Sequence, residues 1–377
     1  MAQLLFSTPA FRPDGSSVED VPILLDERMR LIEPVCAWLM HIALVRGRTR
    51  SSQTWRTYGE ALYDWWQTLE ANGWAWNEIG PGELAAYRDE MLRPRGDSGR
   101  PLARSTINGR LRTIGRFYRW SVANGLMSQV PFAGQEISLS RSRPLGFLAH
   151  VDANGGRAQA NELTMRHVPM LPRPLVPEAI RRIMAGMSAR DRLIVEWAVT
   201  TGIRRMEVAG LTVRHLKRSG SEPMIPVQID ETKGGRSRMI YPPAPLIDRT
   251  RAYVREERAI VVRRTAVNRA DRDPEALFLT CRGQPMKPRR IGAMFTAAAE
   301  AAGVTATFHA LRHTFAAAML RFLQREAQTN PELNPLLTLQ VLLGHADLAT
   351  TAVYLRVVET DLSVIEASVD DLYAALL

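Results

Sequence analysis

The last quarter of the sequence contains a group of residues that could meet at one anionic group. They are histidines, an arginine and a tyrosine. His309 and Arg312 are three residues apart, so on a helix they are neighbours on one face. His345 follows a glycine, and Tyr354 stands nine residues after His345. A tyrosine hydroxyl is a poor nucleophile at neutral pH because its pKa is about 10. It becomes effective when cationic and hydrogen-bonding groups surround the phosphorus that it attacks, and the neighbouring residues could supply these groups.

A helix that begins near His309 is predicted to hold the first polar pair. An apolar stripe runs along the same helix and consists of Leu311, Phe315, Ala318 and Phe322. Such a stripe is typical of a helix that packs one face against a core. We therefore expect the stripe to be buried, while His309 and Arg312 point elsewhere.

The residues from 339 to 354 are predicted to form a helix, a turn and a second helix. Gly344 is a natural stop for the segment 339–343, because glycine readily adopts the left-handed conformation that ends helices. Asp347 is suited to the N-cap of the next helix. His345 would then lie in the turn, and Tyr354 would lie about two turns into the last helix.

These three pieces resemble the signature of the tyrosine recombinases, which are also called phage-integrase family site-specific recombinases. That signature is His-x-x-Arg, then Gly-His, then a tyrosine at the spacing found here. Residues 202–207 read Gly-Ile-Arg-Arg-Met-Glu and match the family's first arginine motif, Gly-hydrophobic-Arg-x-x-Glu. The resemblance assigns the catalytic role to Arg204, which is in register, rather than to Arg205, and a structural role to Glu207. Without the other motifs, this pattern would be typical of a surface ion pair.

A β-hairpin is predicted with strands at 225–230 and 238–241. The turn between them contains two glycines, which can adopt positive φ angles. The family carries a catalytic lysine on such a hairpin, usually before a glycine, and Lys233 fits this context. A lysine at the tip of a turn is otherwise usually just solvated. Arg236 and Arg238 are predicted to contact the DNA backbone.

The resemblance implies a phosphoryl-transfer site whose catalytic residues are Arg204, Lys233, His309, Arg312, His345 and Tyr354. The two arginines would offer planar charged forks to the non-bridging oxygens of one DNA phosphate, and the two histidines would add hydrogen bonds. Tyr354 would attack in line and form a 3′-phosphotyrosyl bond, while Lys233 would protonate the departing 5′ oxygen. Because the cationic side chains replace a metal ion, the resemblance implies neither a metal nor a cofactor.

Composition and charge favour a partner that is a polyanion. The chain has 377 residues, a formal net charge of +10 and a sequence pI of about 10.2. A nucleic acid is favoured over a membrane surface. The apolar run at 35–45 is too short to span a bilayer, and no signal peptide is evident. Cys36 and Cys281 lie far apart and offer no metal-site spacing, so we expect a cytoplasmic bacterial protein that acts on DNA.

The predicted fold class is mainly α with a small antiparallel β-sheet. The resemblance implies a helical N-terminal core-binding domain and a mixed α/β C-terminal catalytic domain of the tyrosine recombinase type. We expect an irregular N-terminal arm at 1–24, the DNA-binding domain at 25–135 and a basic interdomain linker at 136–174. The catalytic domain would occupy 175–377 and include a C-terminal oligomerisation tail.

Basic residues at the starts of two predicted helices are candidates for DNA contacts. A helix N-terminus adds backbone donors for phosphate, which makes these positions favourable. The candidates in the N-terminal domain are Arg104, Ser105, Thr106, Arg110 and Arg112. Those in the catalytic domain, besides the hairpin arginines, are Lys287, Arg289 and Arg290. A solvated basic face is the alternative interpretation of both groups.

Three alternatives to a recombinase remain at this point. His309 and His313 are four residues apart and could hold zinc on a helix, although Ala310 stands where a metalloprotease motif has glutamate. A type IB topoisomerase would share the arginine, lysine, histidine and tyrosine set but would relax DNA alone. A non-catalytic DNA-binding protein could have the same fold.

The expected partners are double-stranded DNA recombination sites and further copies of the chain. The resemblance implies a homo-oligomer, a tetramer on two DNA sites, and allows an accessory directionality factor. The acidic C-terminal tail could dock in cis or on a neighbouring protomer. The basic linker favours a mobile-element recombinase that performs integration, excision or transposition.

Overall fold

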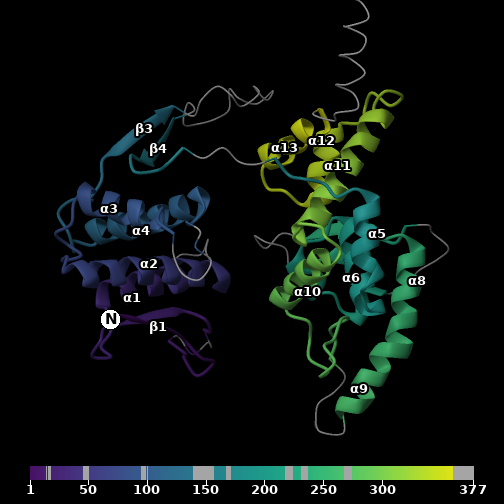
Figure 1. Ribbon diagram of the computed structural model, residues 1–377, viewed down its shortest axis with the longest axis horizontal. Coiled ribbons are helices and arrows are strands. Elements are labelled where there is room, and N and C mark those ends of the chain that lie inside the picture. Colours follow the sequence, from purple (N-terminus) through teal and green to yellow (C-terminus); the bar gives the residue numbers. More distant parts are fainter. Residues whose placement is uncertain are drawn as a thin grey trace, which may run out of the picture. The chain divides into compact units, whose positions relative to one another are not determined.

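The computed structural model divides the chain into two compact units, Met1–Pro169 and Met170–Leu377, each of which is described by itself (Figure 1). The structure describes residues 1–13, 15, 18–45, 51–94, 99, 101–138, 157–166, 171–216, 224–230, 237–266 and 274–359. Both units are dominated by helices, as the sequence patterning predicts.

The first unit is organised around a helical core rich in aromatic side chains. Its helices are α1 (Glu33–Met40), which continues as a π-helical turn (His41–Val45), α2 (Ser52–Asn72), α3 (Pro81–Met91) and α4 (Arg104–Ala123). Trp38, Trp65 and Phe117 are fully buried among them. Trp65 Nε1 donates to the Tyr118 hydroxyl at 3.1 Å, so the one polar atom of the indole is satisfied inside the core.

Two short hairpins complete the first unit, and one of them corrects an expectation. Strand β1 (Gln3–Phe6) pairs antiparallel with β2 (Pro22–Leu25), where we expected an irregular arm. Leu24 is fully buried in the helical core, so this hairpin is anchored by burial of its side chains. Strands β3 (Gly134–Ser138) and β4 (Arg157–Asn161) also pair antiparallel, within or beside the predicted linker.

The second unit is a mixed α/β assembly. Its elements are α5 (Pro177–Ala185), α6 (Ala189–Thr201), α7 (Arg205–Ala209), a 3-10 turn (Val213–Leu216), β5 (Val227–Ile229), β6 (Arg238–Ile240), α8 (Ala244–Tyr253), a π-helical turn (Val254–Arg258), α9 (Ala259–Ala266), α10 (Pro288–Ala301), α11 (His309–Glu326), α12 (Pro335–Leu343) and α13 (Leu348–Glu359). Trp197 is buried in α6, and its Nε1 donates to Thr250 Oγ1 of α8 at 3.1 Å. Strands β5 and β6 pair antiparallel, as predicted for the hairpin.

The fold class predicted from the sequence is confirmed. The second unit combines helices with the antiparallel β5–β6 pair, while the first is helical with peripheral hairpins. Among the described residues, no single helix is long and apolar enough to cross a membrane. Helices α12 and α13, bent by 117° at their junction, meet that test of length and composition only as a pair.

Candidate active site

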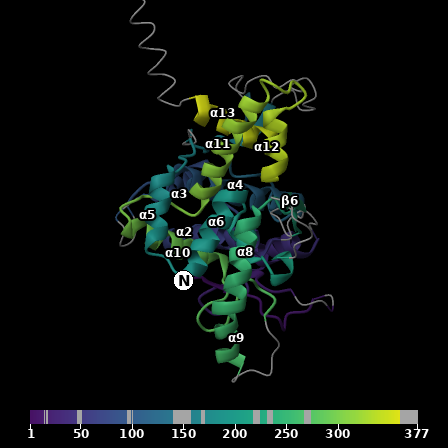
Figure 2. The ribbon, with the colours of Figure 1, turned by 90° about the vertical axis from the view of Figure 1, so that its right-hand side faces the viewer.

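Two turns of the second unit, together with the packing of α11, bring the predicted chemical residues together. Helix α11 packs against α6, α12 and α13, as both ribbon views show (Figure 2). Gly202 ends α6 with a φ of 63°, and a side chain at this position would collide with the Phe315 ring of α11. Gly344 ends α12 with a φ of 60°, and Asp347 accepts a hydrogen bond from the Ala349 amide at the start of α13 at 2.9 Å. Glycine conformations and a side-chain cap therefore set the directions of the helices around the site.

Glu207 is the buried anion around which two arginines are arranged. Its carboxylate accepts from the Arg204 amide and from Arg204 Nη1, both at 2.8 Å, and from Arg238 Nη2 at 2.7 Å. The Glu207 side chain is 1% exposed and that of Arg238 is 4% exposed. Burial alone would raise the pKa of Glu207, but the charge of Arg238 and the hydrogen bonds from Arg238 and Arg204 hold it below its usual value. The Glu207 carboxylate therefore holds Arg204 in position, which is the structural role expected for it.

Three arginines from distant parts of the chain donate hydrogen bonds to the carbonyls at the C-terminal end of α12. Arg238 Nη1 donates to the Leu342 carbonyl. Arg312 Nη2 donates to the next carbonyl, of Leu343, at 2.5 Å, and Arg204 Nη2 donates to the carbonyl of Gly344 at 3.2 Å. A helix C-terminus leaves its carbonyls unpaired and carries partial negative charge, so guanidinium groups are well suited to it. The arrangement concentrates positive charge beside His345.

Arg312 is buried deeply for a charged residue. It is 2% exposed, and its Nη1 donates to the Gly202 carbonyl at 2.5 Å. Burial and the charges of Arg204 and Arg238 lower its pKa to about 9, so the guanidinium remains charged at neutral pH. These two hydrogen bonds, to the carbonyls that end α6 and α12, fix the orientation of the guanidinium group.

The apolar stripe predicted for α11 is partly wrong. Leu311 and Phe315 are buried, but Ala318 and Phe322 are exposed. The buried positions further along the helix are Ala316, Ala317, Leu320 and Leu323. The reason is tertiary: α12 and α13 cover this neighbouring face, and its side chains form a cluster with Leu339, Leu343 and Tyr354.

Tyr354 lies in a group of three histidines. Its hydroxyl lies 2.8 Å from His313 Nδ1, and the residue is 3% exposed. The His345 ring stacks on Tyr354 with a centroid distance of 6.5 Å and an interplanar angle of 8°. The His309 ring meets His313 edge-on at 4.4 Å. The tyrosine, the histidines and the arginine of the predicted constellation thus share one region.

Burial and positive charge shift the titration of these side chains. Burial raises the pKa of Tyr354, while Arg312 and Arg204 act in the opposite direction. Burial, followed by the charge of Arg312, lowers the pKa of His309. Burial, together with His309 and Arg312, lowers the pKa of His313 to about 4. Burial, together with the charges of Arg312 and Arg204, lowers the pKa of His345 to about 4. All three rings are therefore neutral at pH 7 in the free protein.

These neutral histidines predict that the second unit loses stability in mild acid. An unfolded histidine has a pKa of about 6.5, so between pH 6.5 and 4 the unfolded chain binds more protons than the folded chain. The free energy of unfolding must therefore fall as the pH falls through this window. Solvent screens the partly exposed rings, so we expect about 1 kcal/mol from each of His313 and His345. That corresponds to a drop of about 2–4 °C in Tm per histidine.

Calorimetry between pH 7 and pH 4.5 measures this loss. The double variant His313→Asn, His345→Asn cannot titrate at these positions and should show a shallower decline than the wild type. Equal slopes for the two proteins would contradict the prediction.

The structure tests only one of the three basic residues predicted to act on the hairpin. Lys233 and Arg236 lie outside the described residues. Arg238, which we expected to contact DNA, is instead buried against Glu207 and the end of α12. The correction has a physical reason, because a side chain enclosed by a carboxylate and a helix C-terminus is not presented to a duplex. At the start of α10, Lys287, Arg289 and Arg290 are exposed, as a DNA contact requires.

The candidate DNA-binding residues of the first unit lie mostly on one groove. A hollow of about 500 Å³ between α2 and α4 is lined in part by Ser105, Thr106, Arg110 and Arg112. Arg110 is half-buried in an ion pair with Asp64, which already neutralises part of its charge. Arg112 is exposed and donates from Nε to the Asn108 carbonyl at 3.1 Å, and exposed Arg104 donates to the Arg166 carbonyl at 3.4 Å.

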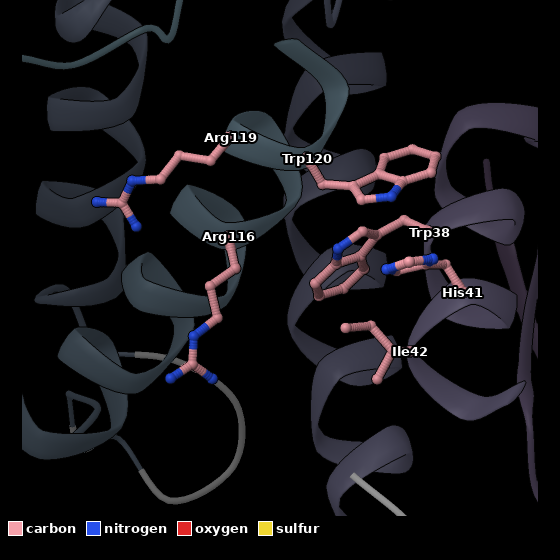
Figure 3. Close-up of a pocket in the computed structure, with 6 residues that line it drawn as sticks. All are labelled: Trp38, His41, Ile42, Arg116, Arg119 and Trp120. Carbon is pink, nitrogen blue, oxygen red and sulfur yellow. The ribbon is translucent and has the colours of Figure 1, made fainter. Parts of the chain in front are cut away.

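A second hollow of the first unit lies between the π-helical turn after α1 and α4. It measures about 390 Å³. Figure 3 shows the guanidinium groups of Arg116 and Arg119 on one side and the rings of Trp38 and Trp120 on the other. Arg116 also donates to the Tyr58 hydroxyl, so its charge is tied to the α2 side of the unit. None of these residues belongs to the predicted catalytic set.

His313 is a site residue whose contact the sequence interpretation missed. We considered it only as a partner of His309 in a zinc site. Its Nδ1 lies 2.8 Å from the hydroxyl of Tyr354, which is 41 residues away in sequence. The available signal was position alone: His313 follows Arg312 directly and lies one helical turn after His309.

Two protein-family models and a group of tyrosine recombinases match the chain. The model of the phage integrase family matches residues 174–360, and that of the phage integrase N-terminal SAM-like domain matches residues 37–125. The chain is 28% identical to the tyrosine recombinase XerD of Caulobacter vibrioides over 334 residues, which is 85% of this chain and 90% of the relative.

Solved structures show the same fold. The chain resembles XerH site-specific recombinase bound to a palindromic difH substrate, with a TM-score of 0.55, 18% identity and coverage of 88% of this chain and 84% of that chain. It also resembles the Tn1549 transposon integrase in complex with circular intermediate DNA, with a TM-score of 0.51, 19% identity and coverage of 85% and 94%.

Proposed function

The chain belongs to the phage integrase family of tyrosine recombinases, which cleave and rejoin DNA at specific sites, and we propose that Tyr354 is its nucleophile. The observation that carries this assignment is the position of the Tyr354 hydroxyl. It lies 2.8 Å from His313 Nδ1. Helix α13, which carries Tyr354, packs against α11, which carries Arg312, and against α12, which ends just before His345. In-line attack would transfer a DNA phosphate to this hydroxyl and form a 3′-phosphotyrosyl bond.

Arg204 and Arg312 are proposed to bind the non-bridging oxygens of the phosphate under attack. Their contacts to backbone carbonyls and Glu207 fix the two guanidinium groups without exhausting their five N–H donors each. Prepositioned charge of this kind stabilises a transition state without reorganisation, and loss of one such donor typically costs a factor of about 10²–10³ in rate.

Three further residues complete the proposed reaction. His309 and His345 would donate hydrogen bonds to the same phosphate, which their neutral rings can do through one N–H. Lys233 would protonate the 5′ oxygen as it departs. The phosphotyrosyl bond conserves the energy of the phosphodiester, so rejoining to a new 5′ hydroxyl requires no nucleotide cofactor. The arginines supply the charge that a metal ion would otherwise provide.

The finer biological assignment is also a proposal. We assign the protein to the movement of a mobile element in a bacterial cytoplasm, by integration, excision or transposition. The likeness to a transposon integrase supports this assignment through the fold. The active assembly would be a homotetramer on two DNA sites, with an accessory directionality factor as a further partner. Sizing of the protein–DNA complex by light scattering tests the tetramer, and a fully active monomeric complex would contradict it.

Covalent capture tests the proposed chemistry. The protein is incubated, without added metal, with nicked duplexes taken from the DNA that flanks its own gene. A nick near the cleavage point lets the short 5′-hydroxyl product diffuse away, so the covalent intermediate accumulates. We expect a denaturation-resistant protein–DNA adduct whose modified peptide, identified by mass spectrometry, contains Tyr354.

Two other outcomes identify the alternatives. Specific binding to these duplexes without an adduct would indicate a DNA-binding protein that lacks catalysis. Relaxation of supercoiled plasmids that carry no recombination site would indicate a type IB topoisomerase activity.

A further inference from the structure

The Tyr354 hydroxyl has one side-chain hydrogen-bond partner among the residues that the structure describes. That partner is His313, whose Nδ1 lies 2.8 Å from the oxygen. The two ring centroids are 5.7 Å apart with an interplanar angle of 52°. A ring nitrogen at this distance from a buried hydroxyl is within reach for proton transfer.

The other two histidines of the group are arranged differently. His345 Nδ1 lies 2.9 Å from Thr351 Oγ1, and its ring stacks on the face of Tyr354 rather than meeting the hydroxyl. His309 contacts the edge of His313. His345 and Thr351 therefore fix the start of α13 against the preceding turn, and His313 engages the oxygen that must react.

We propose that His313 is a catalytic residue that holds the Tyr354 hydroxyl in place and accepts its proton during strand cleavage. This inference rests on the proposed function of Tyr354. As the bond from the tyrosine oxygen to phosphorus forms, the O–H bond breaks and its proton passes to His313 Nδ1. The bond from phosphorus to the 5′ oxygen breaks at the same centre, and that oxygen takes its proton from the general acid. In the rejoining step, the 5′ hydroxyl attacks phosphorus and gives its proton back to the deprotonated general acid. The bond from phosphorus to the tyrosine oxygen breaks, and His313 returns the proton to that oxygen.

The charges around His313 make it a base that responds to bound DNA. Burial, His309 and Arg312 lower its pKa to about 4, so it is unprotonated and able to accept at neutral pH. The facing group on α13 is the Tyr354 hydroxyl itself. A phosphodiester bound beside Arg312 brings one negative charge that offsets the guanidinium, which raises the basicity of His313. Proton acceptance would therefore be favoured when substrate is in place.

Helix α11 carries both His313, which contacts the nucleophile, and Arg312, which is proposed to bind the phosphate. His313 follows Arg312 directly, and Arg312 is anchored to two carbonyls by bonds of 2.5 Å. One rigid helix thus carries a group that would hold the phosphate and a group that would hold the tyrosine. Precise placement of reacting atoms at a near-attack distance is a large part of catalysis in such sites.

The first test needs no DNA. In protein labelled with ¹⁵N-histidine, the His313 signals are assigned by their loss in His313→Asn. We expect Nδ1 of His313 to be the unprotonated nitrogen and to shift in Tyr354→Phe, because the hydrogen bond is removed. His313 signals that are identical in the wild type and Tyr354→Phe would overturn the proposal.

The second test measures single-turnover cleavage on the nicked duplex that gives the wild-type adduct. His313→Ala should form the adduct about 10²-fold more slowly, within the range typical of general-base catalysis, while binding the duplex with unchanged affinity. His313→Asn places a hydrogen-bonding group near the former Nδ1 but cannot accept a proton, so it should remain slow. Wild-type rates in His313→Asn would reduce His313 to a positioning residue and overturn the proton transfer.

A sulfur substitution separates the base from the general acid. A duplex with a 5′-bridging phosphorothiolate has a leaving group that needs no proton. His313→Ala should stay slow on this substrate relative to the wild type, because the defect lies at the nucleophile. Full rescue by the sulfur substrate would place His313 at the leaving group and overturn the proposal. Absence of an adduct in the wild type would instead contradict the proposed function, and the ¹⁵N measurement would still decide the contact.

Discussion

Replacing Tyr354 with phenylalanine should abolish the covalent protein–DNA adduct and leave DNA binding intact. Phenylalanine keeps the ring that packs with Leu339 and Leu343 and against the His345 ring. The substitution removes only the hydroxyl and its hydrogen bond to His313, so the expected cost in stability is about 0.5–1.5 kcal/mol. Adduct formation is followed by denaturing gel electrophoresis, and binding by a mobility-shift titration on the same duplex.

A second tyrosine in the same unit provides the matched control. Tyr241 follows β6 and is 42% exposed, so Tyr241→Phe should form the adduct at the wild-type rate. An adduct that persists in Tyr354→Phe and maps to another residue would contradict the assignment of the nucleophile. Loss of both adduct and binding in Tyr354→Phe would indicate that the variant is misfolded, which a thermal unfolding curve would show directly.

The parts of the site that could be predicted from the sequence are those set by local interactions. The end of α12 at Gly344 and the cap by Asp347 depend on the conformations and side chains of a few adjacent residues. They place His345 in a turn and Tyr354 two turns into a helix, as predicted. The pairing of β5 and β6 was equally predictable, since their sequences flank a segment with two adjacent glycines.

The parts that escaped prediction depend on contacts between distant segments. Arg238 looked like a DNA contact because nothing nearby in sequence shows that Glu207, 31 residues earlier, lies against it. The buried face of α11 shifted because α12 and α13 cover Leu320 and Leu323. The contact from His313 to Tyr354 is likewise a product of helix packing. Periodicity gives the faces of a helix, but the neighbouring elements decide which face is buried.

Replacing Glu207 with alanine should lower the free energy of unfolding by about 3–5 kcal/mol. The substitution leaves Arg238 buried, with a side chain that is 4% exposed and no carboxylate to balance its charge. It also frees the Arg204 amide and guanidinium from the anion that orients them. Activity should therefore fall even at temperatures where the variant is folded. Urea unfolding measures the stability, and the capture assay measures the activity.

The surrounding charges offer a control and a rescue for this variant. Glu178 forms an exposed pair with Arg181, so Glu178→Ala should cost less than about 1 kcal/mol. Adding Arg238→Met to Glu207→Ala removes the stranded charge, so the double variant should recover part of the lost stability. Arg204 would still lack its anchor, so the double variant should not recover activity. Recovery of both properties would mean that Glu207 serves only to neutralise Arg238, whereas equal costs for Glu207→Ala and Glu178→Ala would contradict the buried network as a source of stability.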